Sequence, residues 1–313
     1  MLRFLIHRLV ATLPVLGVVA VIVFSMLRLA PGDPVAVIAG EGASAEDMAL
    51  IRQTLGLDRS LLVQFMAWVG QILSGDLGYS FFYKMKVTEL IAQRLEPTLS
   101  VASVTIVLTV LVSVPLGMLA AWRRGHILDR AIMVLSVAGL SVPVFVAGYV
   151  LIWIFAMHLG WLPSQGYASL SQGVIPWLRG LALPCTTLAI LYCALIARTT
   201  RAAVSEALTE DYVKTARAKG ISEARLMFRH ALPNAAVPIV TVIGLSLAGL
   251  IGGVVVTETI YAIPGLGQLT VDAVLSRDYP LIQGITLFFS LLYVAINLLV
   301  DLSYLALDPR IRY

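Results

Sequence analysis

Six long apolar segments limit what this chain can fold into. A bilayer crossing needs about 20 mostly apolar residues, and only 13% of the chain is charged, against about 25% in an ordinary soluble protein. Helix is the only open-chain structure that pairs every backbone N–H and C=O in lipid. The sequence therefore predicts an all-α integral membrane fold of six transmembrane helices. The predicted spans are 9–29, 98–122, 130–158, 181–199, 236–260 and 281–303.

The distribution of lysine and arginine predicts the orientation of these spans. Of the 22 basic residues, 14 fall in one alternating set of segments: the N-terminal arm, 123–130, 198–229 and the C-terminal tail. Basic residues are enriched in cytoplasmic loops. With an even number of spans, both termini are predicted to be cytoplasmic. The first apolar run is longer than the core of a signal peptide and is interpreted as a retained span.

The segment 30–97, between the first two spans, is predicted to form an extracytoplasmic helical cap. Helix-start residues and helical spacing of apolar residues recur through it. Whether the cap only covers helix ends or also docks a partner stays open. The expected helices follow Ser44, span about 60–73 and span about 86–95, and they end at Gly56, Gly75 and Pro97.

The segment 200–234 is predicted to be a cytoplasmic coupling loop between spans four and five. It contains one helix that ends near Gly220 and a second that opens at Ser222 and is broken by Pro233. A stiff helix with small side chains suits close packing against a moving partner. Contact with anionic lipid explains the charge of the loop but not its run of small residues. A DNA-binding helix-turn-helix is a poor fit, because the loop is tethered to spans at both ends.

The same loop carries a family motif. Residues 214–220 read KTARAKG, and residues 230–233 read HALP. This resembles the EAA loop of permease subunits of bacterial ATP-binding-cassette (ABC) importers, in which Glu-Ala-Ala, three residues and Gly precede Ile-x-Leu-Pro. Lys214, Thr215 and His230 depart from that pattern in the manner of the peptide and nickel subfamily. The resemblance implies an ATPase-coupling site of Thr215, Ala216, Arg217, Ala218, Lys219, Gly220, Ile221, Leu232 and Pro233.

Further motifs extend the resemblance over essentially all 313 residues. They are similar to the B-type permease of dipeptide, oligopeptide, glutathione and nickel importers. The resemblance implies a second homologous permease, two ABC ATPase subunits and an extracytoplasmic solute-binding protein as partners, within a lipid bilayer and without nucleic acid. The matching stretches are PGDP at 31–34, GLD at 56–58, GDLG at 75–78, PGLG at 264–267, RDYP at 277–280 and DPRIR at 308–312.

The sequence lacks the motifs that bind nucleotide, hold a metal or catalyse a reaction. No glycine precedes any of the four lysines, so the chain has no P-loop to hold nucleotide phosphates. The histidines are isolated, and no nucleophile elbow or metal-binding pair is present. Cys185 and Cys193 are interpreted as small apolar side chains that cannot form a disulfide with each other. The chain is therefore predicted not to be an enzyme and to hold no cofactor or metal, with ATP and Mg²⁺ bound by partner subunits.

The fifth predicted span supplies the candidates for the translocation path. Glu258 lies near its outer end, and a charge beside the membrane marks either a solute path or a structural anchor. Gly252 and Gly253 give the span small sides, which suit close helix packing or contact with the path. Both interpretations stay open.

The sequence thus predicts one transmembrane permease domain, 1–313, and the resemblance implies that it imports peptides. Alternating access is the hypothesis for its mechanism. Nickel or glutathione remains an alternative substrate. An ATP-independent secondary transporter is a different class of function, and it predicts mid-span charges or matched broken helices that are not visible here. A membrane-embedded enzyme has no residues to support it.

Overall fold

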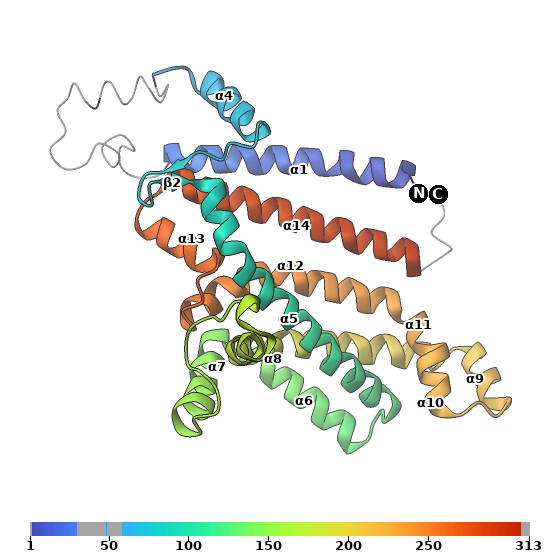
Figure 1. Cartoon of the computed structure of the whole chain (residues 1–313). Helices are drawn as coiled ribbons and strands as arrows, with labels where there is room; N and C mark the ends of the chain where they lie inside the picture. The colour runs from blue at the N-terminus through green and yellow to red at the C-terminus, as the bar shows by residue number, and fades with distance from the viewer. Residues whose placement is uncertain (1, 30–47, 49–57, 308–313) are drawn as a thin grey trace. The chain divides into compact units, whose positions relative to one another are not determined.

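The computed structural model describes residues 2–29, 48 and 58–307, and its regular elements are almost all helical (Figure 1). One short antiparallel hairpin, β1 Tyr79–Ser80 with β2 Met85–Lys86, pairs Tyr79 with Lys86. The α-helices are α1 Leu2–Leu29, α4 Leu61–Leu73, α5 Val87–Trp122, α6 Ile127–Ser141, α7 Val144–Leu151, α8 Val174–Ala207, α9 Asp211–Ala218, α10 Glu223–Leu226, α11 Leu232–Asn234, α12 Ala236–Ile260, α13 Leu266–Leu275 and α14 Tyr279–Leu307. Two π-helices, Ile152–His158 and Met227–Ala231, and a 3-10 helix, Leu170–Gln172, complete the set.

The chain divides into two compact units. The first comprises Glu96–Gln268 together with the residues from Ala295 on, and the second comprises Leu2–Leu95 and Leu269–Val294. Each boundary between the units falls within α5, α13 or α14.

Four helices are long and apolar enough to cross a membrane: α5, α8, α12 and the 26 residues Tyr279–Tyr304 of α14. The pair α6 and α7, with the π-helix that extends α7, gives a fifth crossing if the two are counted together. Within α1, the apolar part Val10–Met26 forms a shorter helix. The described residues therefore contain four or five candidate spans, where the sequence predicted six.

The third predicted span, 130–158, is not one straight helix. It breaks at Val142 and Pro143, and the axes on the two sides differ by 102°. The physical cause is the residue pair itself, because a residue before proline is pushed out of the helical region. Val142 accordingly has φ −87° and ψ 122°, an extended conformation.

The predictions for the segment before the second span have mixed outcomes. The helix at about 60–73 is confirmed as α4, which ends at Ser74 and is followed by Gly75 at φ +84°. The prediction that Pro97 stops a separate helix is wrong. Pro97 lies inside α5, which runs on to Trp122, and proline is tolerated within membrane helices. The helix expected between Ser44 and Gly56 lies outside the described residues.

The second unit is held together by aromatic and polar contacts. Phe24 of α1 packs edge-on against Phe65 of α4, with ring centroids 5.1 Å apart, and also against Trp68. Phe65 and Trp68, three residues apart, lie on one face of α4. Beside the hairpin, buried Ser80 donates a hydrogen bond to buried Asp278, which precedes α14.

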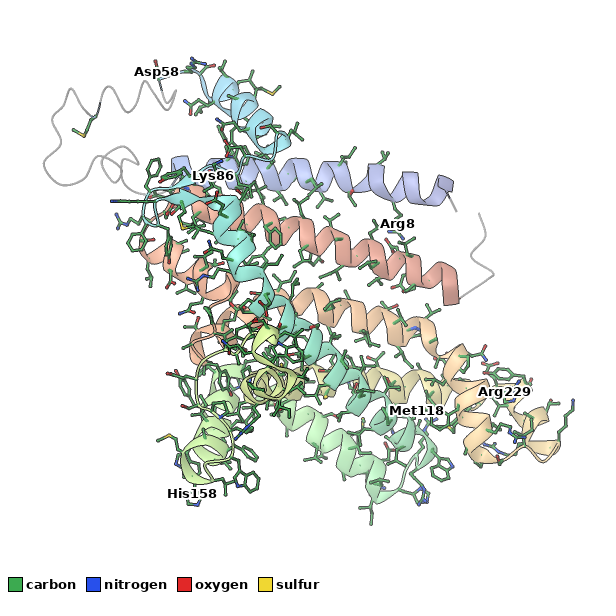
Figure 2. The ribbon with its side chains drawn as sticks, in the orientation of Figure 1. Arg8, Asp58, Lys86, Met118, His158 and Arg229 are labelled. Carbon is green, nitrogen blue, oxygen red and sulfur yellow. The ribbon has the colours of Figure 1, made fainter. Side chains whose placement is uncertain are left out.

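The core of the first unit is formed by α8 with its neighbours. Buried residues of α8, including Leu181, Leu188 and Tyr192, pack with Leu250 and Val254 of α12. Figure 2 places Met118 and Arg229 at one end of this unit and His158 at the other. Cys185 and Cys193 are free, as predicted, and their thiols contact the α5 carbonyls of residues 101 and 109.

Candidate functional site

The loop between α8 and α12 has a small hydrophobic core of its own. One face of α9 buries Val213 and Ala216, three residues apart, against Leu226 of α10. Leu208 and Ile221 pack around these three residues. Residues i and i+3 share a helix face, so this spacing turns the opposite face of α9 outward. Figure 1 shows α9 and α10 near α11 and the N-terminal end of α12.

Gly220 makes the turn that folds α10 back onto α9. Its φ is +75°, a left-handed conformation that costs other L-residues about 1–2 kcal/mol. The Gly220 and Ile221 N–H groups donate to the carbonyls of Arg217 and Ala216, which closes the end of α9. The prediction that the first loop helix ends near Gly220 is confirmed. Ser222 precedes α10, as predicted, but its side chain makes no capping hydrogen bond.

An ion pair between Arg217 and Glu223 joins α9 to α10. The Arg217 Nε and Nη2 donate to the two Glu223 carboxylate oxygens at 2.7 and 3.1 Å. The side chains are 49% and 39% exposed, so the free energy of this pair is at the surface scale of about 0.2–1 kcal/mol. The resemblance implied that Arg217 belongs to the ATPase-coupling site. In the structure its guanidinium is already paired within the loop.

We expect the order of this loop to depend on pH through Glu223. The hydrogen bond from Arg217 lowers the pKa of Glu223, so the pair stabilises the loop above the unfolded pKa of this carboxyl. That contribution is lost as the pH falls through the folded pKa. Amide hydrogen exchange of residues 211–226, corrected for intrinsic rates, is the measurement. Glu223→Gln is expected to abolish the extra acid-induced opening, and Glu210→Gln, at an exposed residue, is not. An unchanged pH dependence in Glu223→Gln contradicts this account.

The other side of the loop packs against α8 and α5. Met227, Ala231 and Ala235 are buried against Val204 and Ala207 of α8 and against the α5 residues Met118 and Ala121. The second loop helix was expected to run from Ser222 to Leu232 and to break at Pro233. Instead a π-helix follows α10, and Pro233 lies in the first turn of α11, where proline is tolerated. The break comes at Ala235, just before α12.

The structure brings the predicted coupling residues together in this loop, but some lie in its apolar core and the others are exposed. Ala216 is buried, and Ile221 and Leu232 are half-buried. The exposed members are Thr215, Arg217, Ala218, Lys219, Gly220 and Pro233. The outward surface of α9 and its following turn is therefore small and polar, supported from below by an apolar core.

Glu258 is fully buried, and both of its carboxylate oxygens accept hydrogen bonds from other segments. Thr98 donates to its Oε1 at 2.6 Å, and the N–H of Gln268 donates to its Oε2 at 3.0 Å. Thr98 also accepts from the N–H of Leu266 at 2.8 Å. The carboxyl group thus ties the turn after α12 to α5. Of the two interpretations that the sequence left open, the geometry supports the anchor, because protein donors occupy both oxygens.

The two glycines of the predicted path lie on different sides of α12. A Cβ at Gly253 lies 3.1 Å from Leu188, so this residue contacts α8. Gly252 is exposed, and a Cβ there meets nothing within 4 Å. The structure therefore does not bring Gly252, Gly253 and Glu258 to one surface.

Several residues of these sites were not identified from the sequence. The PGLG motif at 264–267 was recognised, but not its physical role. A Cβ on Gly265 overlaps the Glu258 carboxyl, and one on Gly267 meets the Val255 backbone. Asp129 and Arg201 form a second polar site. The close spacing of Gly265 and Gly267 was the sequence signal that could have identified the contacts around Glu258. A pairing 72 residues apart in sequence left no signal in a single chain.

Comparisons with known proteins agree with this architecture. Residues 113–313 match the family described as "Binding-protein-dependent transport system inner membrane component", and residues 1–102 match the corresponding N-terminal family. Over 99% of both chains, the sequence is 53% identical to a probable peptide ABC transporter permease of Sinorhizobium fredii. It is 43% identical, over the full length of both chains, to the glutathione transport system permease protein GsiC of Salmonella typhi.

A solved structure shares the fold. A chain of the inward-facing MetNI methionine ABC transporter superimposes with a TM-score of 0.60 at 19% identity, covering 71% of this chain and 97% of that one. Among the described residues, no cluster of three His, Cys, Asp or Glu side chains is placed to hold a metal ion. The family match covers more than half of the chain, and the relatives match throughout. The chain belongs to the binding-protein-dependent transport system inner membrane components, and it is a multi-pass inner-membrane permease subunit of an ABC importer.

Proposed function

We propose that this permease forms half of a peptide path and receives its drive through the surface of α9. The observation that carries the proposal is the construction of the loop. Its outward face is exposed, while Val213, Ala216 and Leu226 stiffen it from behind. A force applied at this face is carried into the first unit by Met227, Ala231 and Ala235. The coupling set is Thr215 to Ile221 with Leu232 and Pro233.

The partners in this proposal are separate chains. Two ABC ATPase subunits bind ATP and Mg²⁺ and dock on α9, so that this chain itself holds no cofactor and catalyses no reaction. A second homologous permease completes the path, and an extracytoplasmic binding protein delivers the solute. Membership of an ABC importer family supports this set of partners in general terms.

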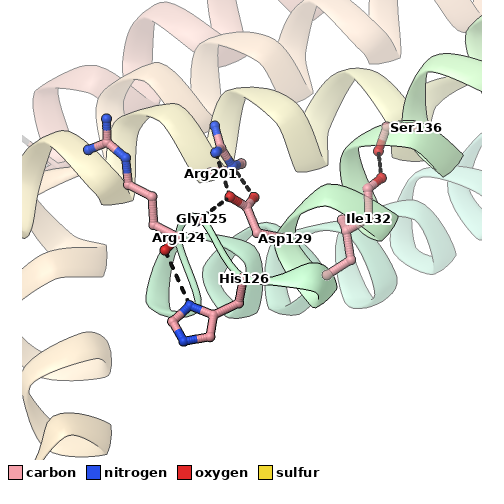
Figure 3. A network of polar contacts seen from close by, with 7 residues as sticks. All are labelled: Arg124, Gly125, His126, Asp129, Ile132, Ser136 and Arg201. Carbon is pink, nitrogen blue, oxygen red and sulfur yellow. Dashed lines mark hydrogen bonds and ion pairs between the residues drawn. The ribbon is translucent and has the colours of Figure 1, made fainter.

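The proposed topology places six spans in one permease domain, 1–313, with both termini in the cytoplasm. The cap 30–97 is extracytoplasmic, and the loop 200–234 is cytoplasmic. Two basic segments support this orientation, because Arg124 and Arg201 lie at the same end of the first unit (Figure 3). Positively charged loops mark the cytoplasmic side.

The proposed solute is a peptide. Support comes from the 53% identical relative, whose name is that of a probable peptide permease, while glutathione is retained because GsiC is 43% identical. On α12 we place the path at the exposed face of Gly252, with Gly253 packing that helix onto α8. Glu258 holds the outer end of the helix. Uptake of labelled dipeptide, oligopeptide and glutathione by the complete complex in vesicles, with its binding protein, tests the substrate.

Replacing Gly220 is expected to uncouple ATP hydrolysis from uptake. Gly220→Val places a β-branched residue at φ +75°, so the turn shifts and the α9 surface is displaced. In vesicles holding the complete complex, peptide uptake per ATP hydrolysed is expected to fall by about tenfold or more. Gly220→Asn is the matched control, because asparagine tolerates the left-handed conformation, and it is expected to retain most coupling. Normal coupling in Gly220→Val contradicts the proposed function.

A further inference from the structure

A second ion pair joins α6 to α8 close to the coupling loop. Arg201 of α8 forms a two-pronged contact with Asp129 in the first turn of α6 (Figure 3). Its Nε donates to Oδ1, and its Nη2 donates to Oδ2 at 2.7 Å. The N–H of Gly125 donates to the same Oδ2 at 2.9 Å. The two carboxylate oxygens therefore accept three hydrogen bonds.

Burial separates this pair from an ordinary surface pair. The Asp129 side chain is 4% exposed and that of Arg201 is 29% exposed, whereas Arg217 and Glu223 in the loop are much more open. A buried carboxylate that loses its partner is left as an uncompensated charge, so single neutral substitutions have strong effects. The planar guanidinium fork also fixes the relative orientation of the two helices, which a lysine ammonium does not do.

The position of the pair gives it a mechanical role. Only Leu208, Thr209 and Glu210 separate the end of α8 from α9. Val204 and Ala207, which carry the buried side of the loop, follow Arg201 within two helical turns. The contact of Arg201 with Asp129 therefore joins this terminal part of α8 laterally to α6.

Further along, α6 stays closely packed on α8. A Cβ at Gly139 lies 3.1 Å from the Ile190 carbonyl oxygen, so the two backbones approach closely there. Past the bend at Pro143, Gly148 of α7 lies against α8 and α12. Its carbonyl accepts from the Tyr261 hydroxyl at 3.3 Å, and that hydroxyl is 2.7 Å from the Thr187 hydroxyl. A continuous set of contacts thus runs from the loop end of the unit to its opposite end.

We propose that Asp129 and Arg201 are a positioning pair that makes α6, α7 and α8 move as one body when the coupling loop is displaced. This rests on the proposed function, because the displacement originates at α9. The competing role is fold stability alone. The two roles differ in measurable ways: a purely structural pair changes the amount of complex, while a positioning pair changes uptake per ATP in the complex that does assemble.

The test uses the complete complex in vesicles, with dipeptide uptake and ATP hydrolysis measured on the same sample. Asp129→Asn and Arg201→Gln are expected to lower uptake per ATP by about tenfold or more in assembled complex. The charge exchange Asp129→Arg with Arg201→Asp is expected to recover part of this loss. Arg198→Gln, at an exposed residue of the same helix, is the matched control and is expected to keep the ratio of the unmodified protein.

Two outcomes overturn the inference: an unchanged ratio in both neutral variants, or a loss of complex with a normal ratio in what remains. Where the neutral variants do not assemble, Arg201→Lys is measured in their place. Lysine keeps the charge but not the two-pronged guanidinium contact, so a lowered uptake per ATP supports the inference and an unchanged uptake per ATP overturns it. Gly220→Val, measured in parallel, tests the proposed function separately. If it couples normally, the proposed function fails; if only the pair variants couple normally, the inference alone fails.

Discussion

Glu258→Leu is expected to destabilise the permease strongly. The substitution leaves the Thr98 hydroxyl and the N–H of Gln268 without their acceptor in a fully buried site. An unsatisfied buried polar group costs about 1–3 kcal/mol, so the combined loss for the two groups is about 2–6 kcal/mol. Leucine also cannot occupy the narrow space against Gly265, which the flat carboxyl fills. The turn after α12 then separates from α5.

The measurement is the thermal unfolding of the assembled complex in detergent. Glu258→Gln keeps the shape and one acceptor oxygen, so it is expected to lose markedly less stability than Glu258→Leu. Thr259→Val changes the neighbouring exposed residue, whose hydroxyl bonds only within its own helix to the carbonyl of Val255, and is expected to behave like the unmodified protein. Equal unfolding temperatures for Glu258→Leu and Thr259→Val contradict the anchor role.

Gly117→Leu is expected to prevent normal packing of α5 against α8. A Cβ at this position lies 2.6 Å from both the Ala197 carbonyl oxygen and the Thr200 Cβ. The carbonyl belongs to backbone and cannot rotate away, so the helices must move apart. Even Gly117→Ala is expected to cost about 1–3 kcal/mol, the usual cost of overpacking, and Gly117→Leu more.

Gly252→Ala, on α12, is the matched control for the Gly117 variants. It is also a glycine within a long apolar helix, but a Cβ there meets no atom within 4 Å. Its unfolding temperature is expected to stay near that of the unmodified complex. If Gly117→Ala is as stable as Gly252→Ala, the close approach of α5 and α8 at Gly117 is not needed for the fold.

The features predicted from sequence are those set by local chemistry. Apolar length identified the cores of α5, α8, α12 and α14, and glycine with helix periodicity placed α9 and its turn at Gly220. The predictions of helix ends failed where they depended on a proline alone. Pro97 lies within a continuous helix, while Pro143 breaks a segment that was taken as one span. The outcome at a proline depends on the packing of its neighbours, which local sequence does not contain.

Contacts between distant segments account for the rest of what was missed. Glu258 was identified as notable because a charge beside an apolar span is costly, but its partners Thr98 and Gln268 come from other elements. Arg201 was assigned only to the basic segment 198–229, and its pairing with Asp129 was not foreseen. Glu223, six residues after Arg217, was close enough to have been considered as its partner.

In the proposed function this chain hydrolyses no ATP itself and is driven through α9 by separate ATPase subunits. Reconstitution of the two permease subunits and the binding protein in vesicles, with and without the ATPase subunits, tests this when ATP hydrolysis and peptide accumulation are recorded together. We expect neither activity without the ATPase subunits and both activities when they are restored. ATP hydrolysis or accumulation of peptide against its gradient by the permeases without them contradicts it.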